Sequence, residues 1–433
     1  MPSGPLAHTG SPSLAAASAM DALHVESAVH PRDGVQASGP GLPAGPLQGL
    51  RVIEICSTIA GPACTRLLGD FGAEVIKIEP PEGDPVRQMG QHVGEVSLYA
   101  SSLLRNKHSV VLDLKTESGR DAARALIASA DVLVENHRPG VMERLGLGYG
   151  ELSACNPGLV MVRISGFGQT GPYALRPGYG AICEAVGGVR HMTGDPDRPP
   201  ARVALATTDY LSSVYAAFGA MAALRERERS GLGQVVDVAL YETAFTQMEP
   251  IVPAYEKLGT VPAREGPNLP RMAPNSLYPA RDGGFVLIAA NSDPTFRRLL
   301  SMMSREDLGH DPRFATIRAR GEPANARALD TEIAAWSSCF DTPELEAMLL
   351  AGEVPAARVY TIADIFRDPH FRAREMLRDV EDPVLGHTTQ IGVVPRLSRT
   401  PGRIRHGGRA LGADTHALLD ATVPAPGGER LKR

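Results

Sequence analysis

The chain has 433 residues, of which 43% are hydrophobic and 21% charged, and this is typical of a globular protein with a large buried core. Its formal net charge of −5 argues against a nucleic-acid partner, and the lack of an apolar run of about 18 residues argues against a membrane span. Five scattered cysteines form no CxxC pair or Cys/His cluster, so we predict reduced thiols, a cytoplasmic location and no metal site.

Residues 1–46 are rich in Pro, Gly, Ala and Ser and have no long hydrophobic period, which predicts a flexible tail. The tail lacks the basic start and compact apolar core of a signal peptide, and its first arginine is Arg32. We therefore expect no targeting segment, and Met20 offers an alternative start of the chain.

The first structured stretch predicts a strand at 50–56, a helix at 63–72 and a second strand at 74–79. Two strands joined by a helix imply a parallel sheet with a right-handed crossover. The intervening loop follows a strand and precedes a helix, which is the edge where open α/β sheets bind ligands. Its sequence, STIAGP, is not GxGxxG, so we predict neither NAD nor FAD.

Further strands are predicted at 109–114, from 131 onward and at 159–168, and helical patterns separate them. This alternation predicts a doubly wound α/β fold. The Pro-rich residues 246–276 have little periodicity, which predicts a linker. Residues 277–303 predict two strands around an Asp-Gly-Gly turn and then a helix, and residues 304–370 are mainly helical.

The stretch 176–224 is centred on Asp209, which follows a Pro-rich loop and precedes a helical pattern. An Asp at a helix start has two interpretations: an N-cap for orphan backbone N–H groups, or a functional carboxylate at the positive end of the helix. The local pattern leaves both open. One face of the predicted helix carries Leu211, Val214, Tyr215, Phe218 and Met221.

Five blocks of the chain occur in the order LQGLRVIEICSTIAGPACTRLLGDFGAEVIKIEPPEGD, NKHSVVLDLKTESGR, ADVLVENHRPGVMERLGLGY, SGFGQTGPY and TTDYLSSVYAAFGAMAAL. Together they resemble the family III CoA-transferases, the group that includes formyl-CoA transferase, carnitine CoA-transferases and α-methylacyl-CoA racemases. The resemblance covers residues 47–420.

The resemblance implies a large domain with a doubly wound parallel sheet, built from both chain ends, plus a small inserted α+β domain. It also implies an interlocked homodimer. The expected organisation is a tail at 1–46, the large domain at 47–245, a linker at 246–276, the small domain at 277–367, a return to the large domain at 368–422 and a tail at 423–433.

The resemblance makes Asp209 the nucleophile. In the family mechanism this Asp attacks the thioester of the donor acyl-CoA, and a mixed anhydride and then an aspartyl-CoA thioester form. The acceptor acid repeats these steps in reverse. The expected substrates are an acyl-CoA and a free carboxylic acid, with no tightly bound cofactor. A carboxylate nucleophile suits this exchange because the acid to be activated is itself a carboxylate.

The CoA-binding positions that match the family differ in chemistry. Lys115, Arg138 and Arg144 suit CoA phosphates, although each has the alternative of a solvated surface charge. Tyr179 matches a residue along the pantetheine path. The full matching set is Ala60, Leu112, Lys115, Asn136, Arg138, Arg144 and Tyr179.

The sequence departs from the family pattern at several positions. Ser57 and Ile59 stand where formyl-CoA transferase has His and Gln, and Pro80 replaces a basic residue. Gly180 stands where many transferases carry an acid, and Glu184, one helical turn later, is our candidate auxiliary acid. Residues 265–279 show no clear copy of the family's glycine-rich loop, which puts formyl-CoA or oxalate specificity in doubt.

The sequence has two alternative functional interpretations. The racemase branch uses a His where this chain has Tyr179, and Tyr is a poor base at neutral pH, so transfer is favoured over racemisation. A CoA-binding protein without turnover is the third reading. Basic side chains that flank the Asp209 segment suggest a dicarboxylate acyl group, with a solvated loop as the alternative: Arg190, His191, Arg198 and Arg202.

Overall fold

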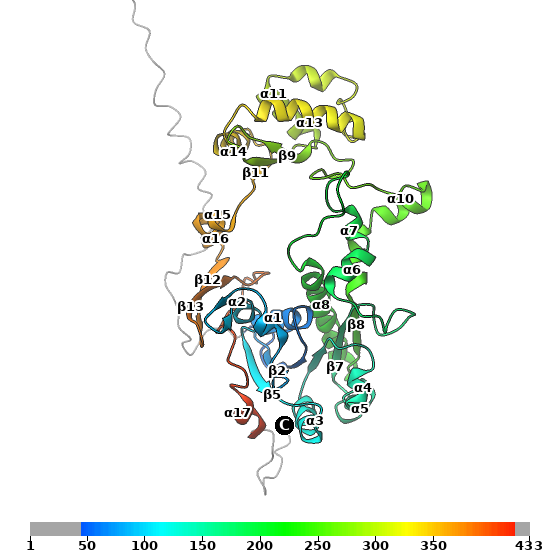
Figure 1. Cartoon of the computed structure of the whole chain (residues 1–433), viewed down its shortest axis with the longest axis vertical. Coiled ribbons are helices and arrows are strands. Elements are labelled where there is room, and N and C mark those ends of the chain that lie inside the picture. The colour runs from blue at the N-terminus through cyan, green and yellow to red at the C-terminus, as the bar shows by residue number, and fades with distance from the viewer. Residues whose placement is uncertain (1–44, 421–433) are drawn as a thin grey trace, which may run out of the picture. The chain divides into compact units, whose positions relative to one another are not determined.

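The computed structural model describes residues 45–420 (Figure 1). The predicted tails, apart from residues 45 and 46, lie outside the described residues, and so does Met20.

A six-stranded parallel sheet forms the larger part of the fold, as the alternating pattern predicts (Figure 1). The strand order is β5-β2-β1-β6-β7-β8, and every neighbouring pair is parallel. The chain therefore builds outward from β1 in one direction, then returns to the other side of β1 and builds in the opposite direction. The strands are β1 (Arg51–Ile55), β2 (Glu74–Glu79), β5 (Lys107–Val111), β6 (Val132–Glu135), β7 (Val160–Ser165) and β8 (Val235–Ala239).

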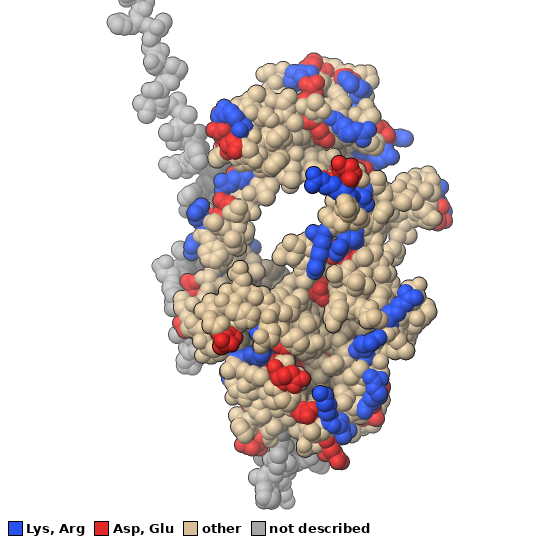
Figure 2. All heavy atoms as spheres, viewed as in Figure 1, with Lys and Arg blue, Asp and Glu red and all other residues tan. Residues whose placement is uncertain are grey.

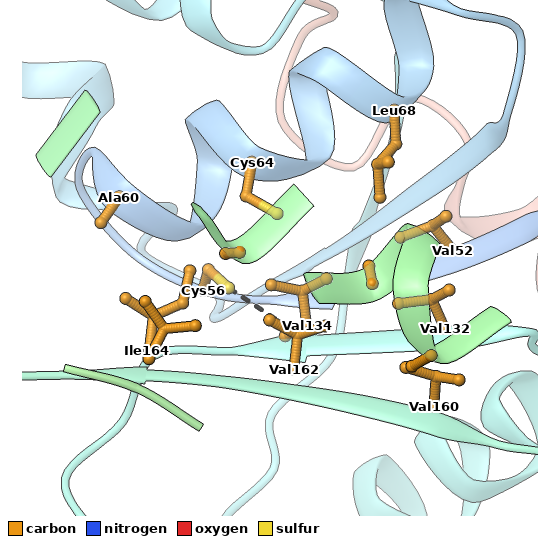
Figure 3. Close-up of a cluster of buried hydrophobic side chains, with 14 of the residues drawn as sticks. Val52, Cys56, Ala60, Cys64, Leu68, Val132, Val134, Val160, Val162 and Ile164 are labelled. Carbon is orange, nitrogen blue, oxygen red and sulfur yellow. Dashed lines mark hydrogen bonds between the residues drawn. The ribbon is translucent and has the colours of Figure 1, made fainter. Parts of the chain in front are cut away.

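Alternating strand residues build a hydrophobic core on each face of this sheet, because successive side chains of a strand point to opposite faces. Val52 of β1 belongs to the cluster that packs against α1 (Ala60–Asp70) and α8 (Thr207–Ser230), shown in Figure 3. Ile53 belongs to the opposite cluster, beneath α3 (Glu117–Ile127). Helices thus cover both faces, which is the doubly wound arrangement.

Helix α8 departs from the expected pattern. Its small residues Ser212, Ala216 and Ala220 are buried, whereas Phe218 is 72% exposed together with Val214, Tyr215 and Met221. Close packing explains this orientation: a Cβ at Gly219 would lie 2.5 Å from Val236 of β8. The apolar stripe therefore faces away from the core of its own chain.

The other elements of the large-sheet region are short. They are η1 (Pro85–Gln88), β3 (His92–Val93), β4 (Val96–Ser97), α2 (Leu98–Leu103), α4 (Val141–Arg144), α5 (Tyr149–Cys155), α6 (Gly180–Val186), α7 (Val189–Met192), α9 (Leu240–Phe245) and η2 (Thr246–Met248).

The segment predicted as a linker contains helix α10 (Ile251–Leu258), which its Pro-rich sequence did not indicate. The apolar residues Val252, Tyr255 and Leu258 recur every three positions in this helix. All three are exposed. Because these apolar residues stay exposed, the helix lacks the buried apolar face by which an amphipathic helix is usually recognised in a sequence.

A second core forms on a three-stranded antiparallel sheet of order β11-β10-β9. The predicted Asp-Gly-Gly turn joins β9 to β10, and Gly283 has the left-handed φ of +83° that the turn requires. This part comprises β9 (Asn275–Pro279), β10 (Phe285–Ala289), α11 (Asp293–Met303), η3 (Glu306–His310), α12 (Ile317–Arg320), α13 (Pro323–Ser337), α14 (Thr342–Ala351) and β11 (Ala356–Arg358).

The end of the chain comes back to the large sheet. The Ser109 N–H of β5 donates to Asp414 (2.9 Å), and the Val111 N–H donates to the Thr415 hydroxyl (3.0 Å). These bonds tie the C-terminal segment to the outer strand. The elements before and within this return are α15 (Ile362–Arg367), α16 (Pro369–Ala373), the hairpin β12 (Leu377–Asp382) and β13 (Gly386–Ile391), and α17 (Thr415–Asp420).

Candidate active site

The strand order sets where a site can form. The winding of the chain reverses between β1 and β6, and ligands of open α/β folds bind at the carboxyl ends of such neighbouring strands. The loop after β1 begins at Cys56, and the loop after β6 begins at Asn136. Both Asn136 amide atoms bond the Ser57 backbone: the side-chain oxygen accepts from its N–H (2.9 Å), and the NH₂ donates to its carbonyl (2.8 Å). Asn136 therefore joins the two loops.

Helix α8 brings Asp209 to the same place. The Ser213 hydroxyl lies 2.7 Å from the Ala60 carbonyl and 2.7 Å from the Asp209 carbonyl, so one proton is shared between the two helix starts. Hydrogen bonds to Ser57 and Ala60 thus connect the loop after β1 with Asn136 and, through Ser213, with the backbone of Asp209. Sequence reasoning missed Ser213, although its position one turn after Asp209 places it on the same face of the helix.

Asp209 is not the N-cap of α8. That position is Ala206, whose methyl group cannot cap, and Asp209 lies in the first helical turn. The capping interpretation is therefore wrong. Burial raises the pKa of the Asp209 carboxyl to about 6, although the positive charge of Arg202 acts to lower this pKa. The carboxyl is thus poised to titrate slightly below neutral pH, a property that functional sites often show.

The groups around Asp209 keep their protons. Burial first, and the Asp209 charge second, raise the pKa of the Cys183 thiol to about 12. The pKa of Tyr99 is raised chiefly by burial. The Tyr210 hydroxyl, 3.1 Å from the Tyr99 hydroxyl, and then the Asp209 charge raise it further. At neutral pH the Asp209 carboxyl is therefore ionised, whereas Cys183 stays a thiol.

Gly180, the first residue of α6, lies directly against the Asp209 carboxylate. A Cβ built on Gly180 would be 2.0 Å from Oδ2 and 3.1 Å from Oδ1 of Asp209. Real Cβ atoms do not approach an oxygen so closely, so a side chain at residue 180 would displace this carboxylate. The departure from the family at this position thus has a structural consequence: an acid at residue 180 would require Asp209 to leave its present position.

Glu184 is buried on α6, and its carboxylate accepts a hydrogen bond from Nε of Arg190 at 2.7 Å. This ion pair gives Glu184 a structural partner. Its role as an auxiliary acid remains a proposal.

The other matching positions are more peripheral. Arg138 donates to the Leu175 carbonyl, and Lys115 and Arg144 are exposed, so both charges are open to solvent. Tyr179 is 74% exposed at the start of α6. Leu112 is buried in a sheet core, so its side chain packs against protein.

The loop that carries Arg198 and Arg202 is held by backbone contacts. Arg264 donates to the carbonyls of Asp195 (3.1 Å) and Arg198 (3.0 Å), and His191 lies 3.0 Å from the Pro262 carbonyl. On the face drawn in Figure 2, groups of Lys and Arg alternate with Asp and Glu.

Within residues 45–420, no three His, Cys, Asp or Glu side chains gather as a metal ion would require. Among the helices of that range, none is long and apolar enough to cross a membrane. All five cysteines lie in the same range as free thiols.

Known proteins resemble the chain over most of its length. The chain is 47% identical to succinyl-CoA–D-citramalate CoA-transferase of Chloroflexus aurantiacus, over 87% of the chain and 94% of that protein. It is 38% identical to the alpha subunit of succinyl-CoA–L-malate CoA-transferase of Chloroflexus aurantiacus, over 92% and 93%.

A solved CAIB/BAIF family protein from Brucella suis shares the fold with a TM-score of 0.77 and 34% identity, covering 88% of the chain and all of that protein. The model of CoA-transferase family III matches residues 47–415. Together with the parallel sheet and the expected blocks, these matches establish that the chain belongs to CoA-transferase family III and is an enzyme that transfers CoA.

Proposed function

We propose that the protein transfers CoA from a dicarboxylic acyl-CoA, such as succinyl-CoA, to a free dicarboxylic acid through an aspartyl-CoA thioester on Asp209. The observation that carries this proposal is the Asp209 carboxylate, which lies against Gly180 with a pKa of about 6. Nucleophilic catalysis needs such a group: ionised at neutral pH, yet partly withdrawn from water.

The proposed steps balance without an added reagent. The Asp209 carboxylate attacks the donor carbonyl, the C–S bond breaks, and a mixed anhydride and CoA thiolate form. The thiolate then attacks the aspartyl carbonyl, which releases the donor acid and leaves aspartyl-CoA. The acceptor carboxylate attacks this thioester, the C–S bond breaks, and a second mixed anhydride and CoA thiolate form. The thiolate then attacks the acceptor's carbonyl, which gives the new acyl-CoA and frees the Asp209 carboxylate. The linked helix starts would hold Asp209 in place during these steps.

The proposed substrate class rests on two observations. The relatives are named for succinyl-CoA and for citramalate or malate, which all carry a second carboxylate. In this chain the Arg202 charge reaches the Asp209 carboxyl. An arginine whose charge acts on the reacting carboxyl suits the distal carboxylate of such a substrate.

A panel of acids tests the proposed function. Incubation with succinyl-CoA should form a new acyl-CoA with four- and five-carbon dicarboxylates at least tenfold faster than with monocarboxylates of equal carbon number, measured by mass spectrometry. Deuterium exchange at the α-carbon without a new acyl-CoA would indicate a racemase. Binding of CoA with neither product would indicate a protein without turnover.

The acidic limb of the pH profile should reflect Asp209. Because the carboxylate is the reactive form, kcat/KM should fall as the pH drops through about 6. Arg202 favours the charged form, so Arg202→Met should move this limb to higher pH and raise KM more for dicarboxylates than for monocarboxylates. Arg225→Met, an exposed arginine later in α8, is the matched control. An unmoved limb in Arg202→Met would contradict the assignment.

We also propose that the enzyme is a cytoplasmic homodimer. The exposed apolar residues of α8 support this, because a face with Phe218 at 72% exposure is suited to a partner surface. The interlocked form implied by the family is part of the same proposal. Light scattering of the purified protein tests the dimer, and a monomer would contradict it.

A further inference from the structure

Four charged side chains are buried beneath the loop that follows β1. Glu54, Lys77, Lys107 and Asp84 are each at most 2% exposed. Lys77 lies 2.7 Å from Glu54 and 2.7 Å from Asp84, and Lys107 lies 2.8 Å from Glu54. Two positive and two negative charges therefore form one continuous network. Burial opposes ionisation of Glu54, but Lys107 and Lys77 outweigh it and hold its pKa at about 2.

The same charges hold the backbone of this loop. Lys77 donates to the Cys56 carbonyl (2.8 Å), and Lys107 donates to the Pro62 carbonyl (2.7 Å). Asp84 accepts from the Thr58 N–H at 2.9 Å. The network thus fixes the start and the middle of the loop and the first turn of α1, while Asn136 and Ser213 hold the loop from the neighbouring loop and helix.

Thr58 has a left-handed backbone, with φ of +64°. A β-branched residue rarely adopts this region, because its side chain crowds the backbone. Strain of this kind persists where the surroundings over-determine it, and it gathers at functional sites. The bond from the Thr58 N–H to Asp84 is such a constraint.

A buried ion network is weak evidence for stability, since apolar residues of similar volume often stabilise a fold as well or better. This network contacts the loop that links to Asp209 through Ala60 and Ser213. We propose that Glu54, Lys77, Lys107 and Asp84 are positioning residues, which hold Thr58 in its strained conformation. They thereby keep the loop in the position that the attack of the Asp209 carboxylate on the thioester requires. This inference rests on the proposed transfer at Asp209.

Thr58→Gly separates positioning from stability. Glycine adopts a positive φ without strain, so the midpoint of thermal unfolding should stay the same or rise. The loop gains freedom, so kcat for CoA transfer should fall at least tenfold. A role in stability alone would move both quantities in the same direction. A matched control is Ser304→Gly, which relieves the strain of a non-glycine residue at a φ of +53° after α11 and should leave kcat within twofold of the wild-type value.

The Asp84 variants test the network itself. Asp84→Asn keeps an oxygen for the Thr58 N–H, so it should lose less kcat than Asp84→Ala. Equal kcat in Thr58→Gly and the wild-type enzyme would overturn the proposal, and so would a fall in kcat that only accompanies unfolding. If Asp84→Ala does not fold, the comparison of Thr58→Gly with Ser304→Gly decides. Absence of transfer in the wild-type enzyme would instead overturn the proposed function.

Discussion

Asp209→Asn is expected to abolish CoA transfer and, at pH 8, to raise the free energy of unfolding. The amide cannot attack a thioester as a carboxylate does, so kcat should drop at least 1,000-fold, or about 4 kcal/mol in activation free energy. The folded enzyme should still bind CoA, because the substitution keeps the shape of the side chain.

The gain in stability follows from the sign of the pKa shift. Burial raises the pKa of Asp209 from 3.8 to about 6, so the ionised carboxyl is disfavoured in the folded state. This penalty is absent below the unfolded pKa, grows as the pH rises from about 4 to 6, and is complete above 6. It amounts to about 1–3 kcal/mol, which Asn should recover at pH 8 but not at pH 4.

Denaturant unfolding at both pH values checks this expectation. Asp121→Asn, on an exposed ion pair of α3, is the control and should change neither activity nor the pH dependence. If Asp209→Asn turned over at more than a few per cent of the wild-type rate, Asp209 would not be the nucleophile. If its stability did not change with pH as described, the burial account of the pKa would be wrong.

Gly180→Ala should reduce kcat by about 100-fold without unfolding the protein. The new Cβ would lie 2.0 Å from Oδ2 of Asp209, so the carboxylate must move by about 1 Å, and a misplacement of that size can lower a rate about 100-fold. Alanine is otherwise favoured over glycine in a helix, so the backbone of α6 should not be weakened. Steady-state kinetics and thermal unfolding provide the two measurements.

Two further variants sharpen this test. Gly150→Ala in α5 is the matched control, because its Cβ would enter open space among the described residues. Gly180→Asp restores the acid of many family members, and we expect it to lose at least as much activity, since the same Cβ displaces Asp209. Activity in Gly180→Asp equal to that of the wild-type enzyme would show that Asp209 can move freely, against our account.

The sequence predicted the parallel sheet because buried β-branched strands alternate with helical patterns along the chain. Orientation was harder to predict. The stripe that contains Phe218 has the spacing of a core-facing stripe, yet α8 turns its small residues inward, because Gly219 packs closely on Val236. Spacing defines the faces of a helix, but the depth of the available space decides which face is buried.

The candidate site was predictable in part. The resemblance located Asp209 and the loops of Ala60 and Asn136, which the structure links through Ser57 and Ser213. The proximity of Gly180 to Asp209 was not predictable, since it depends on how α6 packs on α8.

The buried charge network beneath the loop was not predicted either. Glu54, Lys77 and Lys107 come from three strands that are neighbours only in the folded sheet. Their pairing has no local sequence signal, although a charged residue inside a buried strand is itself a hint that a partner exists.

The central claim is that CoA becomes attached to Asp209 during transfer. Incubation of the enzyme with succinyl-CoA, followed by acid quench, proteolysis and mass spectrometry of the peptides, tests it most directly. We predict a CoA-mass adduct on the peptide that contains Asp209, which forms within one turnover and disappears when an acceptor acid is added. An adduct on another peptide would contradict the mechanism. So would an enzyme that turns over while none of its acid-quenched samples contains the adduct.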